Sequence, residues 1–420
     1  MGSYATLGIG KYDYMMSKNC LSDFLLIFNS WERREEKYIE DEQEFTSYKY
    51  VTTVKTAKQC LDFSGYGLAQ IEKAFTASRE DMEYLFEHEY DDKAETAIAE
   101  YTFDSWRFVV KNYARKLSSE GYPWKAEDDA WFNNIEKVNV SEYIVARSLR
   151  FNSFSFWGLP EGIDPWIVFR IVLEAFDDDD EVVLDYGDLV EGGWCDAIPN
   201  DDEFVYDKVL VLTEGVTDSE FISSSIKLLY PHLNKFFHFM DFGIMKVSGS
   251  VSFLAHYIKA FAGAKINNRI IGLFDNDSAA KDELLNLRGI RLPHNIKIVS
   301  LPDIELARNY PTLGPMQNQD IDINGLACSI ELFFGKDVLQ RDDGSLTPIR
   351  WTGYKDRISQ YQGEIQDKSI LQEKFRNKLA LAEQVQDIEK ANWKEMIILI
   401  ETLISVVNNI RHPYRDPEGS

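Results

Sequence analysis

The sequence predicts an α/β protein in which a parallel sheet flanked by helices follows a mainly helical amino-terminal domain. With 420 residues, 45% of them hydrophobic, the chain can form two or three domains with cores of their own. Before residue 206, apolar residues recur at spacings of three and four, which is typical of helices. After it, short β-rich apolar runs alternate with helical patterns. We therefore expect an amino-terminal domain at residues 1–206, an α/β domain at residues 207–340 and a helical segment at residues 341–420.

The amino-terminal domain begins with SYATLGIGKYDYM, whose alternating small, aromatic and polar residues favour a strand or hairpin. Helical spacings follow, for example in YGLAQIEKAFTAS and AETAIAEYTFDSWRFVVKNYARKL. Near the end of the domain, EVVLDYGDLVEGGW predicts a strand followed by a glycine turn. Acidic, turn-rich stretches on either side of it, Asp177 to Asp180 and Pro199 to Glu203, place the domain boundary near residue 206.

The α/β domain contains four predicted strands with helical patterns between them. The strand candidates are Val209 to Gly215, Lys235 to Gly243, Arg269 to Asp277 and Ile296 to Ile304. The first helix between them is expected to begin at a capping Thr217. This alternation predicts a parallel sheet covered on both faces, with ligands at the carboxyl ends of the strands. Farther on, Ile370 to Arg411 predicts a helical hairpin that packs on the sheet or on a second subunit, so we expect a dimer.

Charge is distributed unevenly along the chain. In total, 45 basic and 70 acidic residues give a net charge of −25, and residues 1–206 hold 20 of the basic and 42 of the acidic ones. We therefore do not expect this half to bind nucleic acid by itself. Between Lys246 and Lys297, eight basic residues stand against four acidic ones. A polyanion is expected to dock there, through Lys246, Lys281, Arg288 and Arg291.

The sequence favours a cytoplasmic protein in a reducing compartment. Its longest near-apolar run, Met396 to Val407, is interrupted by Glu401 and is shorter than the roughly 20 residues that cross a bilayer. The amino terminus lacks the charged and then apolar layout of a secretory signal. The four cysteines are far apart, without the spacing of a metal site.

Acidic residues follow two of the predicted strands. Glu214 and Gly215 end the first strand, and Asp275, Asn276 and Asp277 end the third. Because three converging carboxylates would repel one another, the pattern favours a hard divalent cation such as Mg²⁺, which binds carboxylate oxygens. The alternative for Asp277 is a structural one, in which it caps the helix that follows.

The segments TEGVTD and LFDND resemble the Toprim domain of topoisomerases, bacterial primases, the ribonuclease that matures 5S ribosomal RNA, and the overcoming-lysogenization-defect (OLD) nucleases. The resemblance covers about residues 207–340 and is closest to the OLD branch, which has a Ser-x-Glu and a downstream lysine. It implies a Toprim-like sheet and two Mg²⁺ or Mn²⁺ ions. The residues it implies are Glu214, Asp275 and Asp277 for the principal metal, Asp218 and Glu331 for the second, Ser329 for orientation and Lys368 beside the scissile phosphate, with Lys378 and Lys336 as alternatives.

The first half and the domain order resemble HEPN/Toprim amino-terminal domain proteins, in which a segment like SYATLGIGKYDY opens the chain. Many such proteins belong to bacterial conflict systems against phage. HEPN ribonucleases have an arginine followed four to six residues later by histidine, and here only Arg288 and His294 meet that spacing, in the other half. We therefore expect the amino-terminal domain to be a scaffold, dimerisation or recognition module. Since the phosphate-binding motif G-x-x-x-x-G-K-[ST] does not occur, nucleotide-driven control would come from an ATPase or sensor partner.

The leading hypothesis is a divalent-metal-dependent endonuclease of DNA, with RNA as the alternative substrate, acting as an effector in anti-phage defence. A second hypothesis is a catalytically silent Toprim module that binds nucleic acid, a nucleotide or a partner protein. A third, nucleotidyl transfer as in primases, uses the same carboxylates, but the OLD-like residues argue against it.

Overall fold

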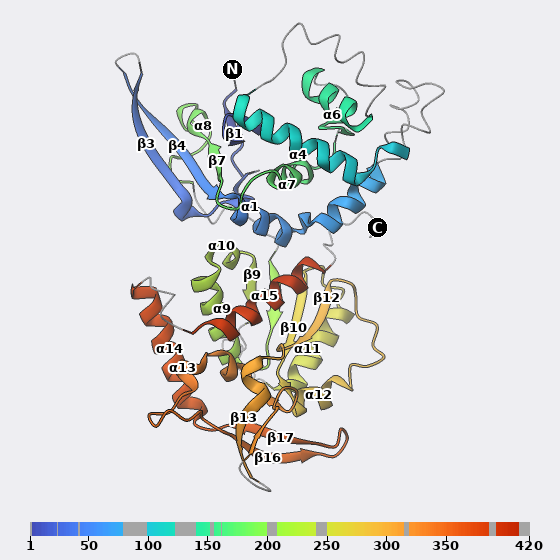
Figure 1. Cartoon of the computed structure of the whole chain (residues 1–420), viewed down its shortest axis with the longest axis vertical. Coiled ribbons are helices and arrows are strands. Elements are labelled where there is room, and N and C mark those ends of the chain that lie inside the picture. Colours follow the sequence, from blue (N-terminus) through green and yellow to red (C-terminus); the bar gives the residue numbers. More distant parts are fainter. Residues whose placement is uncertain are drawn as a thin grey trace. The chain divides into compact units, whose positions relative to one another are not determined.

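The computed structural model describes residues 2–22, 24–40, 43–78, 99–121, 140–151, 155–160, 162–199, 208–240, 250–314, 319–385 and 392–410. The chain divides into two compact units, residues 1–206 and 207–419 (Figure 1). The fold is mixed α/β, with both parallel and antiparallel sheets. Among the described helices, none is long and apolar enough to cross a membrane. Lys246 lies outside the described residues.

The first unit is built on a five-stranded antiparallel sheet with the order β2-β1-β7-β4-β3. Its strands are β1 (Tyr4–Ile9), β2 (Tyr12–Lys18), β3 (Arg33–Glu40), β4 (Gln43–Thr53) and β7 (Glu181–Asp185). The hairpin at the amino terminus and the strand at 181–185 are thus confirmed. Strands β3 and β4 were not predicted, because the edge strand β3 (RREEKYIE) is charged and exposed and has no apolar period.

Helices cover this sheet and join its strands. They are α1 (Val54–Leu61), α4 (Phe103–Glu120), α6 (Val140–Phe151), α7 (Pro165–Leu173), α8 (Gly187–Glu191), the π-helical η3 (Asp62–Tyr66), and the 3-10 helices η1 (Leu25–Ile27) and η2 (Ser30–Glu32). A short hairpin of β5 (Ser155–Phe156) and β6 (Leu159–Pro160) is fixed to α4, where Trp106 Nε1 donates to the carbonyl of Trp157 at 2.8 Å. The prediction of a mainly helical unit is therefore corrected to a mixed one.

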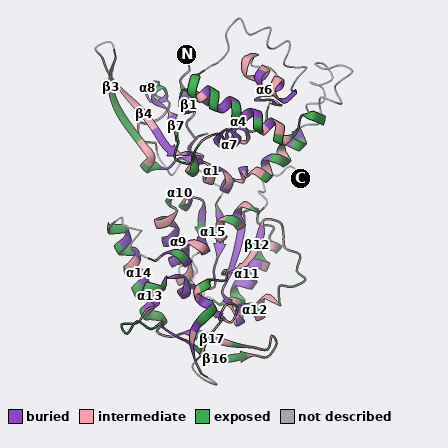
Figure 2. Ribbon diagram, in the orientation of Figure 1, coloured by how far each residue is buried: buried purple, intermediate pink, exposed green. Residues whose placement is uncertain are grey.

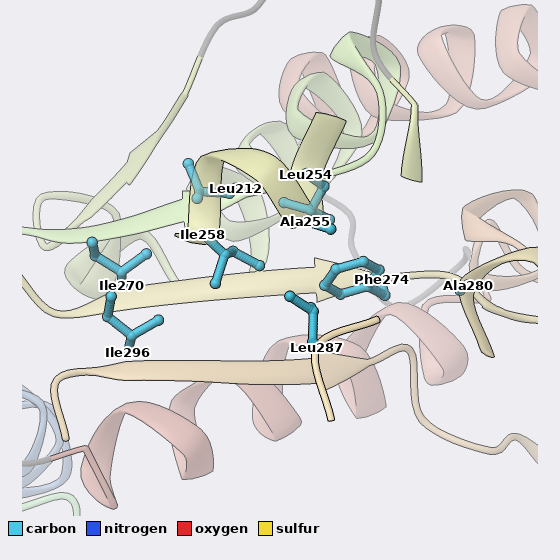
Figure 3. Packing of buried hydrophobic residues seen from close by; sticks show 9 residues of the cluster. All are labelled: Leu212, Leu254, Ala255, Ile258, Ile270, Phe274, Ala280, Leu287 and Ile296. Carbon is cyan, nitrogen blue, oxygen red and sulfur yellow. The ribbon is translucent and has the colours of Figure 1, made fainter. Parts of the chain in front are cut away.

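The second unit contains the predicted parallel sheet, with the order β12-β10-β8-β9. The strands are β8 (Val209–Leu212), β9 (Phe237–Phe239), β10 (Ile270–Phe274) and β12 (Ile296–Ser300), and each lies within a segment that the sequence predicts. Buried side chains of these strands pack against α11 (Val251–Gly263), and Figure 3 shows Ile258 of this helix facing β10. A Cβ at Gly272 would lie 2.4 Å from Cδ1 of Ile258, so glycine lets the helix approach the strand closely. Figure 2 shows the two central strands, β8 and β10, as mostly buried.

Helices α9 (Val216–Leu229), α10 (Pro231–Asn234), α11 and α12 (Ser278–Leu284) connect the parallel strands. The predicted cap at Thr217 is wrong, since α9 begins at Val216 and its N-cap is Gly215. The reason is local. The backbone of Gly215 is extended, and its N–H donates to Asp218 Oδ2 at 2.9 Å, which places the N-cap two residues earlier than expected.

The chain beyond the parallel sheet forms a second sheet that was not predicted, with the order β14-β13-β16-β17. Its strands are β13 (Tyr310–Leu313), β14 (Gln319–Ile321), β16 (Ile349–Lys355) and β17 (Gln360–Ile365). Next to it, β11 (Asn276–Asp277) pairs with β15 (Ala327–Cys328). The segment after residue 340 is therefore not wholly helical. Its strands were missed because β16 and β17 mix glycine, aromatic and polar residues without an apolar alternation.

The remaining helices are α13 (Lys336–Leu339), α14 (Lys368–Val385), α15 (Lys394–Asn408), and the 3-10 helices η7 (Glu305–Asn309) and η8 (Ile330–Phe333). Of these, α14 and α15 pack beside α9. The predicted carboxy-terminal helices are confirmed. Phe375 of α14 stacks on Phe334 with ring centroids 4.1 Å apart, and both rings contact Phe221 of α9. This contact fixes α14, and with it Lys368, against the parallel-sheet layer.

Candidate functional site

The first part of the site is formed where β8 and β10 end. These strands are parallel neighbours, with Ile270 opposite Leu210, so their carboxyl ends lie at the same edge of the sheet. Glu214 follows β8 and Asp275 follows β10. The backbone N–H of Asp275 donates to Glu214 Oε1 at 2.9 Å. The two acidic strand ends that the sequence singled out are therefore in direct contact.

Asp277 has a structural role that is visible in its hydrogen bonds. Its Oδ1 accepts from the N–H of Ala280 at 2.7 Å and caps α12, as the structural alternative predicted. Its Oδ2 accepts from Gln362 Nε2 of β17 at 2.8 Å. The carboxylate of Asp277 nevertheless faces the other acids closely enough to raise the pKa values of Glu214 and Asp275.

Another part of the site is centred on Glu331, which is fully buried in η8. Its Oε2 accepts from Ser329 Oγ at 2.7 Å, and its Oε1 lies 3.1 Å from Nζ of Lys368. Gln372 Nε2 donates to the same Oε1 at 2.9 Å. The Ser-x-Glu pair and the first-choice lysine are therefore brought together, although half of the Lys368 side-chain surface (53%) stays open to solvent.

The two alternative lysines lie elsewhere in the structure. Lys378 is buried and donates to the carbonyls of Phe334 and Asn392 and to Asp337, while its ammonium lies 4.4 Å from the centroid of Trp393. Burial lowers its pKa despite the pairing with Asp337. Lys378 thus holds α14 to its neighbours, and Lys336 is exposed at the start of α13. Of the three candidates, Lys368 is the one in contact with Glu331.

The pKa values of Glu214, Asp218 and Asp275 are all raised, which shows that these acids have too little positive charge near them. Burial, together with the negative charges of Asp277 and Asp218, raises the pKa of Glu214 to about 7. Burial and the charge of Glu331 raise the pKa of Asp218 to about 6. Burial raises the pKa of Asp275 well above its usual value, and the negative charges of Glu214 and Asp218 raise it further. One ammonium group therefore does not neutralise the cluster.

Lys368 is that ammonium group. Burial by itself would lower its pKa, but the attraction of Glu331, Asp275 and Asp218 outweighs burial, and the pKa is raised. Lys368 therefore stays charged at neutral pH and is drawn toward the acids from the start of α14.

The donor set fits a hard divalent cation in its chemistry, because every candidate ligand is a carboxylate. In the described part of the chain, however, no three His, Cys, Asp or Glu side chains stand in an arrangement that could hold a metal ion. The oxygens are turned to protein donors instead. Glu214 accepts from a backbone N–H, Asp218 accepts from the N–H of Gly215, and Glu331 accepts from three side chains. A cation would therefore have to replace some of these donors.

Two residues of this site were not predicted from the sequence, Gln372 and Gln362. A signal for Gln372 exists, since it lies four residues after Lys368 and thus on the same face of α14. For Gln362 no such signal exists, because strand β17 itself was not predicted. The basic candidates Lys281, Arg288 and Arg291 are all exposed, on α12 and in the loop after it.

A family model described as HEPN/Toprim N-terminal domain 1 matches residues 1–208. The first unit is thus similar to that family, and the match ends before Glu214. No curated protein and no solved structure matches the chain.

Proposed function

We propose that the second unit is a Toprim-type site that hydrolyses phosphodiester bonds with the help of divalent metal ions, and that its substrate is DNA, with RNA as the alternative. The family match to residues 1–208 suggests a nuclease-related role for the chain. The family description pairs the amino-terminal domain with Toprim, and the unit that follows here begins with a parallel sheet and acidic strand ends.

The observation that carries the proposal is the set of mutually repelling carboxylates at the carboxyl end of β8 and β10. Glu214, Asp218 and Asp275 all have raised pKa values, because burial and neighbouring negative charge act together. A fold keeps such a cluster only at a cost in stability, so clusters of this kind mark functional sites. A bound divalent cation would remove the repulsion.

The residues take distinct roles in this proposal. Glu214, Asp275 and Asp277 would hold the principal ion, and Asp218 and Glu331 the second one. Bound ions would supply an activated water and neutralise charge on the phosphate. Ser329 orients Glu331 through its hydrogen bond of 2.7 Å. Lys368, charged and half-exposed beside Glu331, can leave the acid and donate to a phosphate oxygen.

The resemblance to OLD nucleases and to proteins of conflict systems extends the proposal to an effector in anti-phage defence. The first unit would be its scaffold or recognition module, since the residues needed for a HEPN ribonuclease do not occur there. We further propose a cytoplasmic protein that acts as a dimer and is controlled by an ATPase or sensor partner.

The test compares the wild type with Asp275→Asn on supercoiled plasmid, linear DNA and RNA, each with Mg²⁺, Mn²⁺ or EDTA. We expect cleavage with metal by the wild type and a loss of about a thousand-fold in the variant, since metal catalysis supplies several kcal/mol. The matched control is Glu373→Gln, an exposed acid on α14 that lies outside the cluster and should cleave normally. Equal cleavage by the wild type and Asp275→Asn would show that the assignment of the catalytic site is wrong.

A second candidate function is a catalytically silent module that binds nucleic acid, a nucleotide or a partner protein. It is favoured by the engagement of Glu331 with Ser329, Gln372 and Lys368, three protein donors with which a metal ion would have to compete for this carboxylate. Stabilisation of the wild type by Mg²⁺ against heat, without turnover of any substrate, would support this candidate over the nuclease.

A further inference from the structure

One face of the β16–β17 hairpin carries three aromatic rings. Tyr354 and Tyr361 are directly opposite each other in the two strands, and Trp351 is opposite Gly363. Residues three apart in a regular strand point to opposite faces, so Trp351 and Tyr354 would normally be separated. The register shifts between Trp351 and Gly353, and this bulge adds one residue and returns both rings to the same face. We call Trp351, Tyr354 and Tyr361 the aromatic face.

The rings of the aromatic face contact one another but remain open to solvent. The centroids of Tyr354 and Tyr361 are 5.0 Å apart, and those of Trp351 and Tyr361 are 6.1 Å apart. Tyr354 is 49% exposed and Tyr361 is 41% exposed, whereas Trp351 is half-buried over Gly363. The tyrosines therefore contribute little to the core of the unit. Adjacent exposed rings of this kind are typical of a binding surface.

The surroundings of the aromatic face are basic in an acidic protein. The hairpin and residues 278–297 together hold seven basic and four acidic side chains, although the whole chain has a net charge of −25. Arg350 and Arg357 are exposed on the hairpin, and Lys281 is exposed on α12. Arg357 joins these two elements, since its guanidinium donates to Asn286 Oδ1 at 2.8 Å. The surface therefore suits a ligand that carries both ring faces and negative charge.

The hairpin is also attached to the acidic cluster. Gln362, next to Tyr361 in β17, donates to Asp277 Oδ2 at 2.8 Å, and Ser278 Oγ donates to the carbonyl of Tyr361 at 2.7 Å. Three residues after β17 ends, Lys368 begins α14 and contacts Glu331. Strand β17 thus connects the residue that contacts Asp277 with the helix that begins at Lys368. Because neighbouring residues of a strand point to opposite faces, Tyr361 points away from the face on which Gln362 reaches Asp277. A ligand on the aromatic face would therefore be linked to the carboxylates through the hairpin.

We propose that the aromatic face is a binding site for single-stranded nucleic acid, whose unpaired bases stack on Tyr354 and Tyr361 while the neighbouring basic residues hold its phosphates. Stacking requires an accessible base face, which a duplex hides, and it tolerates any sequence because every base has such a face. The further step, that this unpaired strand is the substrate of the acidic cluster, rests on the proposed nuclease function. Binding itself requires neither metal nor cleavage.

The test measures binding in EDTA, where no cleavage occurs, with fluorescent 20-residue oligonucleotides of thymidine or uridine and a duplex of the same length. We expect the wild type to bind a single strand more tightly than the duplex. Tyr354→Ala and Tyr361→Ala should each weaken that binding about ten-fold, as expected for the loss of one stacked base. Tyr354→Phe and Tyr361→Phe keep the ring and should bind as the wild type does.

The matched control is Tyr38→Ala. Tyr38 is 46% exposed on strand β3 of an antiparallel hairpin in the acidic first unit, so its loss should leave binding unchanged. If the alanine variants of the aromatic face bind like the wild type, or if the duplex binds as tightly as the single strands, the proposal is wrong. The thymidine and uridine oligonucleotides show whether the ligand is DNA or RNA.

A second assay separates this proposal from the proposed function. The small diester bis(4-nitrophenyl) phosphate tests hydrolysis without a need for stacking. Tyrosine-dependent binding together with normal hydrolysis of the diester by the tyrosine variants would support both proposals. Tyrosine-dependent binding without any metal-dependent hydrolysis by the wild type would support the binding site and contradict the nuclease. Metal-dependent hydrolysis by the wild type, together with binding that is unchanged in the tyrosine variants, would support the nuclease and contradict the binding site.

Discussion

Each unit of the chain buries a group of acidic side chains, and the two groups have opposite electrostatics. In the first unit, the buried guanidinium of Arg170 donates to both Asp62 and Glu174. Burial alone would raise the pKa of Glu174, but these contacts with Arg170 lower it. In the second unit, burial and like charges raise the pKa of Glu214 and of Asp275. The same residue types are thus neutralised in one unit and left repelling in the other.

The difference teaches how to separate structural from functional acids in this chain. A guanidinium with a fixed, forked geometry can satisfy two carboxylates and leave no need for a ligand. At the ends of β8 and β10, the positive charge comes from Lys368, which is half-exposed and lies 3.1 Å from Glu331. The second group therefore has unused negative charge that a cation can neutralise. The number of acidic residues in a unit therefore does not indicate where a cation-binding site lies.

The largest expected effect on stability comes from removing the cation of the balanced group. Arg170→Met leaves the half-buried Asp62 without its guanidinium and Glu174 with Arg107 as its ion-pair partner, and should lower the free energy of unfolding by about 3 kcal/mol, or Tm by roughly 6–12 °C. Asp275→Asn removes a charge from a repelling group and should leave Tm unchanged or higher. Calorimetry of both variants measures the contrast.

The control for this contrast is Arg34→Met, which breaks an exposed ion pair with Glu181 and should change the free energy of unfolding by less than about 1 kcal/mol. A similar loss of stability in Arg170→Met and Asp275→Asn would mean that the two groups of acids do not differ as described.

Lys368→Met should have the next largest effect. It should lower the rate of cleavage but increase the stabilisation of the protein by Mg²⁺. Loss of the ammonium should lower cleavage about a hundred-fold, because a charge that stabilises the transition state is gone. The same change removes the charged one of the two donors to Glu331 Oε1 and leaves Gln372, so stabilisation by Mg²⁺ against heat should increase. Lys374→Met, an exposed lysine on the same helix, is the control and should change neither quantity. Weaker stabilisation by Mg²⁺ in Lys368→Met would show that Lys368 does not compete with the ion.

The pH dependence of stability gives a third, smaller contrast. The pKa of Glu214 is about 7 in the folded protein and 4.5 in the ordinary group. The folded state therefore keeps a proton that the unfolded chain releases, and the free energy of unfolding should fall as pH rises from about 4.5 to about 7. Glu214→Gln removes this contribution, so the variant should gain about 3 kcal/mol relative to the wild type at pH 8 and less than about 1 kcal/mol at pH 5.

Urea unfolding of both proteins at the two pH values measures this difference, and Mg²⁺ at pH 8 should reduce it by stabilising the wild type. The same difference at both pH values would place the titrating group elsewhere.

The sequence could predict the parallel sheet and the meeting of its acidic ends, because strands such as IIGLF are apolar throughout and the order of elements fixes which ends face the same edge. It could not predict β3 or the β16–β17 hairpin, because an exposed edge strand and a bulged aromatic hairpin have no apolar period. It could not decide between capping and metal binding for Asp277, because both need the same residue at the same position. The contact with Gln362 is long-range and depends on a strand that the pattern does not show.

The smallest predicted effect concerns Gln372, which donates to the same oxygen of Glu331 as Lys368 but carries no charge. If the acids of the second unit form a functional group, a neutral residue that orients one of them should matter for rate and little for folding. Gln372→Met removes one hydrogen bond to a buried carboxylate, and we expect kcat to fall about ten-fold, with KM and Tm nearly unchanged. Gln372→Asn, which keeps the amide on a shorter side chain, should recover part of the rate. A large fall in Tm with an unchanged rate would instead place Gln372 and Glu331 among the structural groups, beside the acids that Arg170 neutralises in the first unit.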